Sequence, residues 1–286
     1  MRKITFKKGL SFTARHLFLL VLCLIWLIPI FWLVLNSFSV FQGVNIRRFY
    51  PEEWTLENYR WLLFSGGDSI AQFTVWFRNT LTIAVFTCLI SSSFVLMVSY
   101  AMSRMRFNGR RGLMNIGVLL GLFPGFLSMI AVYFILQTFN LTNNHWGLIM
   151  VYSGGAGLGY LIAKGFFDTI SETLSESARI EGATESQVFL HVIVPLAKPI
   201  IVYTVIASFL VPWMDFIFAR IILNSGLSKD WTVAIGLYNM LDRSSINTYF
   251  ARFCAGGVLV SIPISVLFVI MQKFYVEGIT SGAVKG

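Results

Sequence analysis

Charged side chains are scarce in this chain of 286 residues. Asp, Glu, Lys and Arg together make up 12% of the sequence and hydrophobic residues 56%, whereas a soluble domain usually carries about 25% charged residues. This deficit excludes a soluble globular protein with a polar surface and indicates a polytopic membrane protein. The net charge of +9 would suit a nucleic-acid partner, but the distribution of the basic residues argues against one.

Motifs for catalysis and for nucleotide or metal binding are also lacking. The sequence contains no G-x-x-x-x-G-K-[ST], so the chain has no P-loop with which to hold ATP itself. Its three histidines lack metal-ligand spacing, and no nucleophile is accompanied by a base. We therefore expect a non-catalytic chain without a metal or cofactor of its own. The cysteines lie within apolar runs, which favours packed small side chains over disulfides: Cys23, Cys88 and Cys254.

Long apolar segments dominate what is present. A helix needs about 20 residues to cross a hydrocarbon core of about 30 Å. The segments that meet this length are Leu17–Leu35, Thr80–Met102, Leu113–Leu136, Trp146–Phe166, Ile200–Leu223 and Phe253–Phe274. No A-x-A cleavage pattern follows the first segment, so we interpret it as a retained span rather than a signal peptide. The predicted fold is all-α, with six spans over 17–274 between an N-terminal segment, 1–16, and a tail, 275–286.

Basic residues mark the cytoplasmic side of such a protein. The five basic residues before the first span have no acidic neighbour, and neither do the arginines between the second and third spans. The loop from Gln137 to His145 contains no Lys, Arg, Asp or Glu, and the segment 36–79 balances its charges. This alternation predicts that both termini lie in the cytoplasm. The basic excess is therefore a topology signal that anionic lipid supports, and no nucleic-acid partner is expected.

The segment between the fourth and fifth spans, 168–199, is the one large cytoplasmic excursion. Its early Ser, Thr and Glu residues are typical of a helix start, where hydroxyls cap backbone amides and the helix dipole favours anions. Gly182 permits the backbone to turn, and a second short helix is expected near Thr184–His191. Pro195 and Pro199 then set the entry into the fifth span.

Two interpretations of this excursion are available. It could be an interfacial helix that lies among the lipid headgroups, or a docking surface for a soluble partner. An anionic leaflet would repel its acidic residues, which outnumber the nearby cations, so docking is favoured. These acidic residues are Glu172, Glu176, Glu181 and Glu185.

The same excursion resembles the signature of permease subunits of binding-protein-dependent ABC importers, a cytoplasmic Glu-Ala-Ala followed by Gly and then by Ile-x-Leu-Pro. The matching positions are Glu176, Ala178, Gly182 and Pro195. Ser177 replaces the first Ala, Glu181 stands where Asp is frequent, and Val192 and Val194 replace Ile and Leu. From Tyr275 onwards the tail resembles that of the smaller permease of maltose and maltodextrin importers.

The resemblance implies a type I importer in a bacterial cytoplasmic membrane. Its other parts would be a second permease, two ATPase subunits that bind ATP and Mg, and an extracytoplasmic solute-binding protein that delivers an oligosaccharide. The expected contacts with the ATPase come from Glu176, Ala178, Arg179, Glu181, Gly182, Ala183 and Pro195 in the excursion, hereafter the coupling segment (168–199), and from Gly278, Thr280, Gly282 and Lys285 in the tail. The outer stretch Asn224–Ala251 resembles a loop that probes the binding protein.

A charged residue within the fifth span is the remaining candidate for transport chemistry. Asp215 would cost about 2.5–3.5 kcal/mol at a helix centre on insertion scales, so it should face protein or water. One interpretation is that it lines the translocation path and binds sugar hydroxyls, with Trp213 stacking on a pyranose ring. The alternative is an ion pair or interfacial position together with Arg220.

Two other functions stay open at the level of sequence. A permease for amino acids, peptides or other sugars would share the coupling signature. An ion-coupled secondary transporter would need several acidic or His groups at mid-membrane, for which Asp215 alone is thin support. The tail and the long first outer loop favour an oligosaccharide.

Overall fold

The computed structural model describes residues 2–44, 48–64, 72–122, 124–155 and 159–283, with side chains described from residue 15 to residue 272. The described residues are almost entirely helical, and their one isolated β-bridge joins Ser39 to Trp54. They form two compact units, 1–66 with 239–259 and 67–238 with 260–286.

Several helices are suited to a membrane. Three are long and apolar enough to cross one, and the number rises to six if each of three bent helix pairs forms one span. The three long helices are α1 (Arg2–Ser37), α3 (Phe73–Arg104) and α14 (Ile246–Ala283). Each of the six predicted segments overlaps one of these helices or pairs. The chain is therefore a polytopic membrane protein.

Three of the predicted spans are not continuous helices. The third consists of α4 (Arg110–Gly121) and α5 (Gly125–Thr138), whose axes differ by 103°, and the fourth of α6 (His145–Gly154) and α7 (Gly159–Asp168), which differ by 40°. Glycine flanks both breaks, and glycine is a poor helix former. The fifth divides into α11 (Lys198–Met214) and α12 (Ile217–Ile222).

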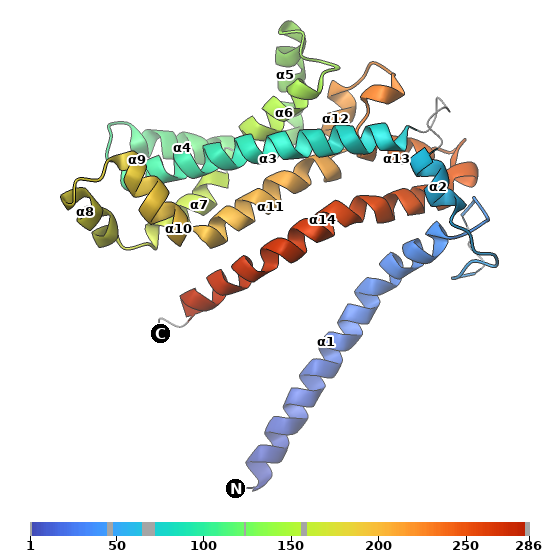
Figure 1. Cartoon of the computed structure of the whole chain (residues 1–286), viewed down its shortest axis with the longest axis horizontal. Helices are drawn as coiled ribbons and strands as arrows, with labels where there is room; N and C mark the ends of the chain where they lie inside the picture. Colours follow the sequence, from blue (N-terminus) through green and yellow to red (C-terminus); the bar gives the residue numbers. More distant parts are fainter. Residues whose placement is uncertain (1, 45–47, 65–71, 123, 156–158, 284–286) are drawn as a thin grey trace. The chain divides into compact units, whose positions relative to one another are not determined.

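In the larger unit, α3 and α11 lie side by side, and α6 and α7 pack against α3 (Figure 1). Lipid is as apolar as leucine, so small and hydroxyl-bearing side chains rather than the hydrophobic effect favour close packing of such helices. Ser99 of α3 donates to the carbonyl oxygen of Tyr160 at 3.0 Å, and the hydroxyls of Ser92 and Ser208 lie 3.3 Å apart. These contacts fix α3 against α7 and α11.

The start of α3 also holds the stretch that follows α12. Trp76 Nε1 donates to the carbonyl oxygen of Ser228 at 2.8 Å, and Asn79 Nδ2 donates to that of Trp231 at 3.0 Å. Gly236 lies so close to the Trp76 ring that a Cβ there would clash with it. The helices placed in this way are η3 (Ser228–Asp230) and the first part of α13 (Val233–Met240).

The smaller unit gathers the end of α1, the short helix α2 (Glu57–Phe64) and the first part of α14. Asn58 is buried and donates to the carbonyl oxygens of Ser37 at 3.0 Å and Ser39 at 2.8 Å. The Arg252 guanidinium lies 3.9 Å from the centre of the Trp61 ring. The segment after the first span is thus a packed structure rather than an open loop.

Candidate functional site: the coupling segment

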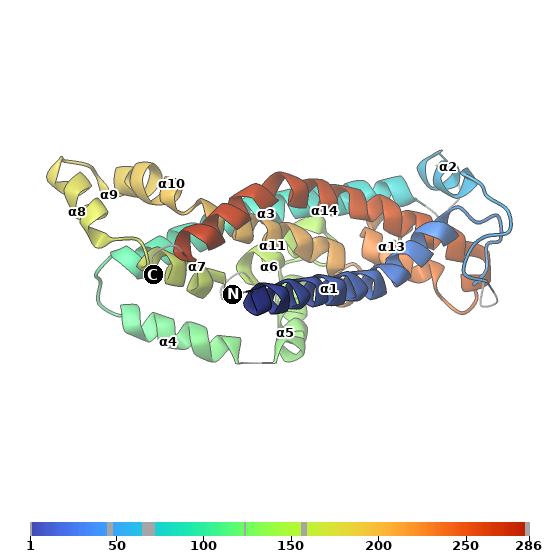
Figure 2. The same cartoon turned by 90° about the horizontal axis from the view of Figure 1, so that it is seen from below.

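The coupling segment lies at one end of α3 and α11, as Figure 1 and the perpendicular view in Figure 2 show. It contains α8, a tight joint, and a second helical stretch whose axis turns by 85° into α11. The bounds are α8 Glu172–Ile180, α9 Glu185–Gln187, the π-helical η2 Val188–Ile193 and α10 Val194–Leu196.

The joint after α8 is a Schellman motif. The amide of Ala183 donates to the carbonyl oxygen of Ala178 at 3.0 Å, and the amide of Gly182 donates to that of Arg179 at 3.0 Å. This pair of bonds requires a left-handed residue at the turn, and Gly182 has φ +89°. The two alanines pack against the same buried cluster. Four of the residues assigned to coupling therefore build the joint itself, Arg179 through its carbonyl oxygen.

The second helical stretch begins at a capping box. Thr184 Oγ1 accepts from the amide of Gln187 at 3.4 Å, and the Gln187 side chain accepts from the amide of Thr184 at 2.8 Å. This reciprocal pair satisfies two amides that a helix start leaves free, so the helix begins where the sequence predicted. Pro195 lies in the first turn of α10, where no intrahelical N–H is needed.

A buried cluster fixes the segment to the bundle. Val188 and Ile193 of η2 are fully buried, and they pack with Phe167 of α7, Val95 of α3 and Ile200 of α11. Of the α8 residues, Ser175 is buried. The inner face of the segment is thus part of the bundle's core.

The outer face of α8 is exposed and partly apolar. Glu176 and Glu181 are exposed. Ile180 is 87% exposed, the largest fraction among the large apolar side chains that the structure describes. The exposed face of α8 thus presents one large apolar side chain beside acidic groups.

An ion pair spans the joint. Arg179 Nε donates to Glu185 Oε1 at 2.6 Å, Arg179 Nη2 donates to Glu185 Oε2 at 3.2 Å, and the Tyr100 hydroxyl donates to Oε2 at 2.8 Å. The hydrogen bonds from Arg179, followed by that from Tyr100, lower the pKa of Glu185 below its ordinary value. Arg179 is therefore turned toward the joint, and its contact with an ATPase stays a prediction.

A cleft of ≈ 770 Å³ separates α8 from the loop that follows α3. Charged residues of both signs line it, which suits a polar protein surface better than a small apolar ligand. Its lining comprises Arg104, Met105, Arg106, Phe107, Glu172, Ser175, Glu176, Arg179 and Glu185.

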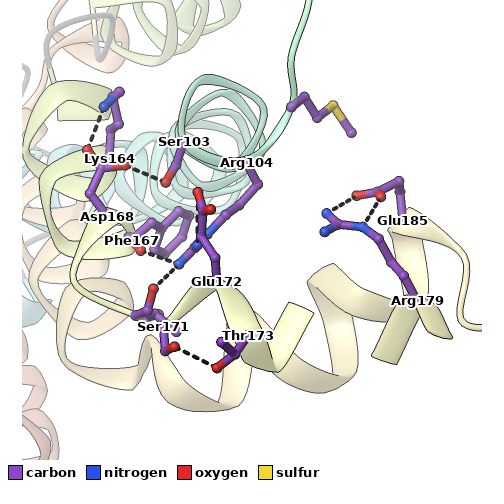
Figure 3. A network of polar contacts seen from close by, with 12 residues as sticks. Ser103, Arg104, Lys164, Phe167, Asp168, Ser171, Glu172, Thr173, Arg179 and Glu185 are labelled. Carbon is purple, nitrogen blue, oxygen red and sulfur yellow. Dashed lines mark hydrogen bonds and ion pairs between the residues drawn. The ribbon is translucent and has the colours of Figure 1, made fainter. Parts of the chain in front are cut away.

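Sequence reasoning missed the residues of α3 that contact the segment. Tyr100 was assigned only to a span, Arg104 only to a topology signal, and Ser103 to neither. All three contact the coupling segment or the residue before it (Figure 3 shows Ser103 and Arg104). Their spacing of three and four places them on one helix face. The available signal was that a tyrosine, a serine and an arginine share one helix face at the end of a span, where they can form hydrogen bonds with a neighbouring segment.

The predicted tail contacts are described only in part. Gly278, Thr280 and Gly282 lie in the last turns of α14, and their side chains are not described. Lys285 lies outside the described residues. Contact between this tail and an ATPase stays a prediction.

Asp215 and Trp213 occupy the break between α11 and α12. Asp215 Oδ1 accepts from the amide of Phe218 at 3.1 Å, and Oδ2 accepts from the Tyr152 hydroxyl at 2.6 Å. The carboxylate thus caps α12, while Arg220 lies 5.6 Å from the centre of the Trp231 ring. Trp213 is 5% exposed and packs against the rings of Phe77 and Phe209.

Beside Tyr152 is a cavity of ≈ 330 Å³ whose polar lining includes Ser91, Tyr203, Thr204 and Ser208.

These features, a helical membrane bundle with a jointed helix at one end, define a permease-type subunit. Residues 96–281 match the family described as "Binding-protein-dependent transport system inner membrane component". The chain belongs to this family. Its members are components of transport systems, which agrees with the expected non-catalytic class and with an integral protein of the inner membrane.

Individual relatives carry sugar-related names. The chain is 33% identical to the galactooligosaccharides transport system permease protein GanQ of Bacillus subtilis, over 95% of this chain and 94% of that protein. It is 29% identical to the maltodextrin transport system permease protein MalD of Streptococcus pneumoniae, over 99% of both. A chain of a bacterial ABC transporter involved in the import of the acidic polysaccharide alginate has the same fold, with a TM-score of 0.76, 23% identity and coverage of 92% and 95%.

Proposed function

We propose that this chain is a permease subunit of an oligosaccharide ABC importer. Its relatives of nearly equal length include permeases named for galactooligosaccharides and maltodextrin. The chain forms half of a translocation path, with six spans and both termini in the cytoplasm of a bacterium. It works with a second permease, two ATPase subunits that hold ATP and Mg, and an extracytoplasmic solute-binding protein.

The observation that carries this proposal is the construction of the coupling segment. Its inner face is part of the buried core, and its outer face presents Glu176, Ile180 and Glu181 to solvent. A surface of this kind transmits the movement of a separate ATPase to the spans. The oligosaccharide cargo follows from the relatives, because the cavity beside Tyr152 is lined mainly by apolar side chains and Asp215 caps α12.

Uptake by the complete complex in proteoliposomes tests the proposal. We expect a panel of oligosaccharides to identify a cargo whose uptake and ATPase stimulation need internal ATP and the binding protein. Uptake that a proton or sodium gradient drives without ATP would favour a secondary transporter. The purified chain alone should bind no ATP.

A charge inversion on α8 tests the role of the coupling segment. Glu176→Lys should insert normally but separate ATP hydrolysis from uptake, because it reverses the charge of the exposed docking face. Glu53→Lys is the matched control, since Glu53 is an exposed glutamate of the segment after the first span. Equal uptake by the Glu176 and Glu53 variants would contradict the docking role.

A further inference from the structure

The cytoplasmic end of α3 holds the entry to the coupling segment. Arg104 Nη2 donates to the carbonyl oxygen of Phe167 at 2.6 Å and also to that of Ile170. Ser103 Oγ donates to Asp168 Oδ1 at 2.6 Å (Figure 3). The three accepting residues, Phe167, Asp168 and Ile170, lie at the end of α7 and in the connection directly before α8. The last turn of α3 therefore sets where α8 begins.

The same turn of α3 also holds the second helical stretch. The Tyr100 hydroxyl donates to Glu185 Oε2 at 2.8 Å, and the Tyr100 ring lies 4.9 Å from the ring of Phe189. Glu185 follows the Gly182 joint and is paired with Arg179 before it. One helix turn thus contacts the chain both before and after α8.

Burial makes the Arg104 contact specific. Its side chain is 3% exposed, so backbone carbonyl oxygens replace water around the charge, and the nearest carboxylate oxygen, of Glu172, lies 4.0 Å away. A buried cation is tolerated only where such partners hold it. The planar guanidinium reaches two carbonyl oxygens at once, which the single ammonium of lysine does not reproduce.

The covalent path from the coupling segment to the membrane is less direct. After η2 and α10, the chain turns by 85° before α11 begins. The bend lies at Ala197, so the axis of the segment is not continued by the axis of α11. The contacts of α3 bypass this bend.

We propose that Arg104 and Tyr100 are positioning residues that make α3 move together with the coupling segment, so that α3 is the span that receives the movement of the ATPase. This inference rests on the proposed function. Neither residue touches the cargo or the ATPase in this scheme. Both act through the coupling segment that they hold.

The first test compares Arg104→Gln with Arg111→Gln in the reconstituted complex. Arg111 is exposed at the start of α4 and carries the same charge on the same side. We expect Arg104→Gln to raise the ATP hydrolysed per sugar transported by about tenfold, which corresponds to about 1.4 kcal/mol, and Arg111→Gln to leave it unchanged. Arg104→Lys should give an intermediate ratio. Wild-type coupling in the assembled Arg104→Gln complex, or full coupling with Lys, overturns the proposal.

The second test uses smaller changes, in case Arg104→Gln does not assemble. Tyr100→Phe removes one hydroxyl and Glu185→Gln one charge. Each should raise the ATP hydrolysed per sugar transported. The double variant should have no higher ratio than the more severe single variant, because both changes break the same Tyr100–Glu185 hydrogen bond. Additive effects, or wild-type ratios in all three variants, overturn the proposal.

A third measurement separates this proposal from the proposed function. If the wild-type complex takes up no oligosaccharide, the proposed function fails. Trypsin cleavage after Arg179 in the full chain, held in nanodiscs, still reports how tightly α3 holds the segment. Arg104→Gln should be cleaved faster than Arg111→Gln. Equal cleavage rates would contradict the proposal that Arg104 holds the coupling segment against α3.

Discussion

The amide of Ala183 donates to the carbonyl oxygen of Ala178 across the joint, at 3.0 Å. This bond closes the end of α8 and leaves Gly182 in the left-handed conformation. The motif residues Ala178, Gly182 and Ala183 are therefore explained by the geometry of the helix end. Contact of these residues with an ATPase stays a prediction.

Gly182→Ala should weaken the joint. A Cβ at Gly182 meets nothing within 4 Å, so the penalty comes from φ +89° alone and amounts to about 1 kcal/mol. We expect faster amide hydrogen exchange in the segment, because its local opening costs less free energy. We also expect poorer coupling of ATP hydrolysis to uptake. Gly182→Pro should uncouple more strongly.

Gly165→Ala is the matched control for this change. Gly165 lies inside α7, and a Cβ there also meets nothing within 4 Å. Because alanine is the better helix former by about 0.5–1 kcal/mol, this variant should be at least as stable as wild type. Equal hydrogen exchange and equal coupling in the Gly182→Ala and Gly165→Ala variants would show that the joint tolerates a side chain.

Ile180→Ser should weaken assembly with the ATPase without destabilising the chain. Ile180 is 87% exposed, so it contributes little to the fold, whereas burial in an interface would stabilise the complex by about 1.5–3 kcal/mol. Titration of the ATPase against the nanodisc-embedded permease pair measures the effect. Leu227→Ser, at a 52% exposed leucine after α12, should bind normally. Unchanged affinity of the Ile180 variant would remove this residue from the interface.

Deletion of residues 278–286 should weaken assembly with the ATPase or its regulation, as the resemblance of the tail implies. Co-purification and the ATPase rate of the full complex measure this. Replacement of the same residues by a Gly-Ser segment of equal length controls for chain length. If deletion leaves both quantities at their wild-type values, the tail has no such role.

The coupling segment could be predicted from sequence because its determinants are local. Gly182 at the turn, Thr184 at the cap and Pro195 at a helix start each act within a few residues. The start of α3 at Phe73, ahead of the predicted Thr80, was missed because Arg78 and Asn79 made its first turns look like a loop.

The contacts that hold the segment could not be predicted in the same way. Arg104 and Phe167 are 63 positions apart in the sequence, and Tyr100 and Glu185 are 85 apart. No periodicity links such pairs, because their meeting depends on how α3 packs against α7 and η2. The arginine also served as a topology signal, which concealed its second role.

Asp215 provides a test that separates a helix cap from a cargo contact. Its carboxylate accepts from the amides of Phe218 and Ala219, at 3.1 and 3.2 Å, and from Tyr152. Asp215→Ala should lower the free energy of unfolding by about 1 kcal/mol, because a cap is lost. Asp215→Asn should lower it less, since Asn also caps a helix but offers only one accepting oxygen to the three donors.

Uptake kinetics of these variants then decide whether the carboxylate also meets the cargo. For a lining role, Asp215→Asn should raise the sugar concentration for half-maximal uptake by more than its loss of stability, judged against that of Asp215→Ala, would explain. Tyr152→Phe, which removes the hydroxyl that donates to Asp215, is the companion variant and should shift uptake in the same direction. If Asp215→Asn takes up sugar with wild-type kinetics while Asp215→Ala is unstable, the carboxylate serves only to cap α12.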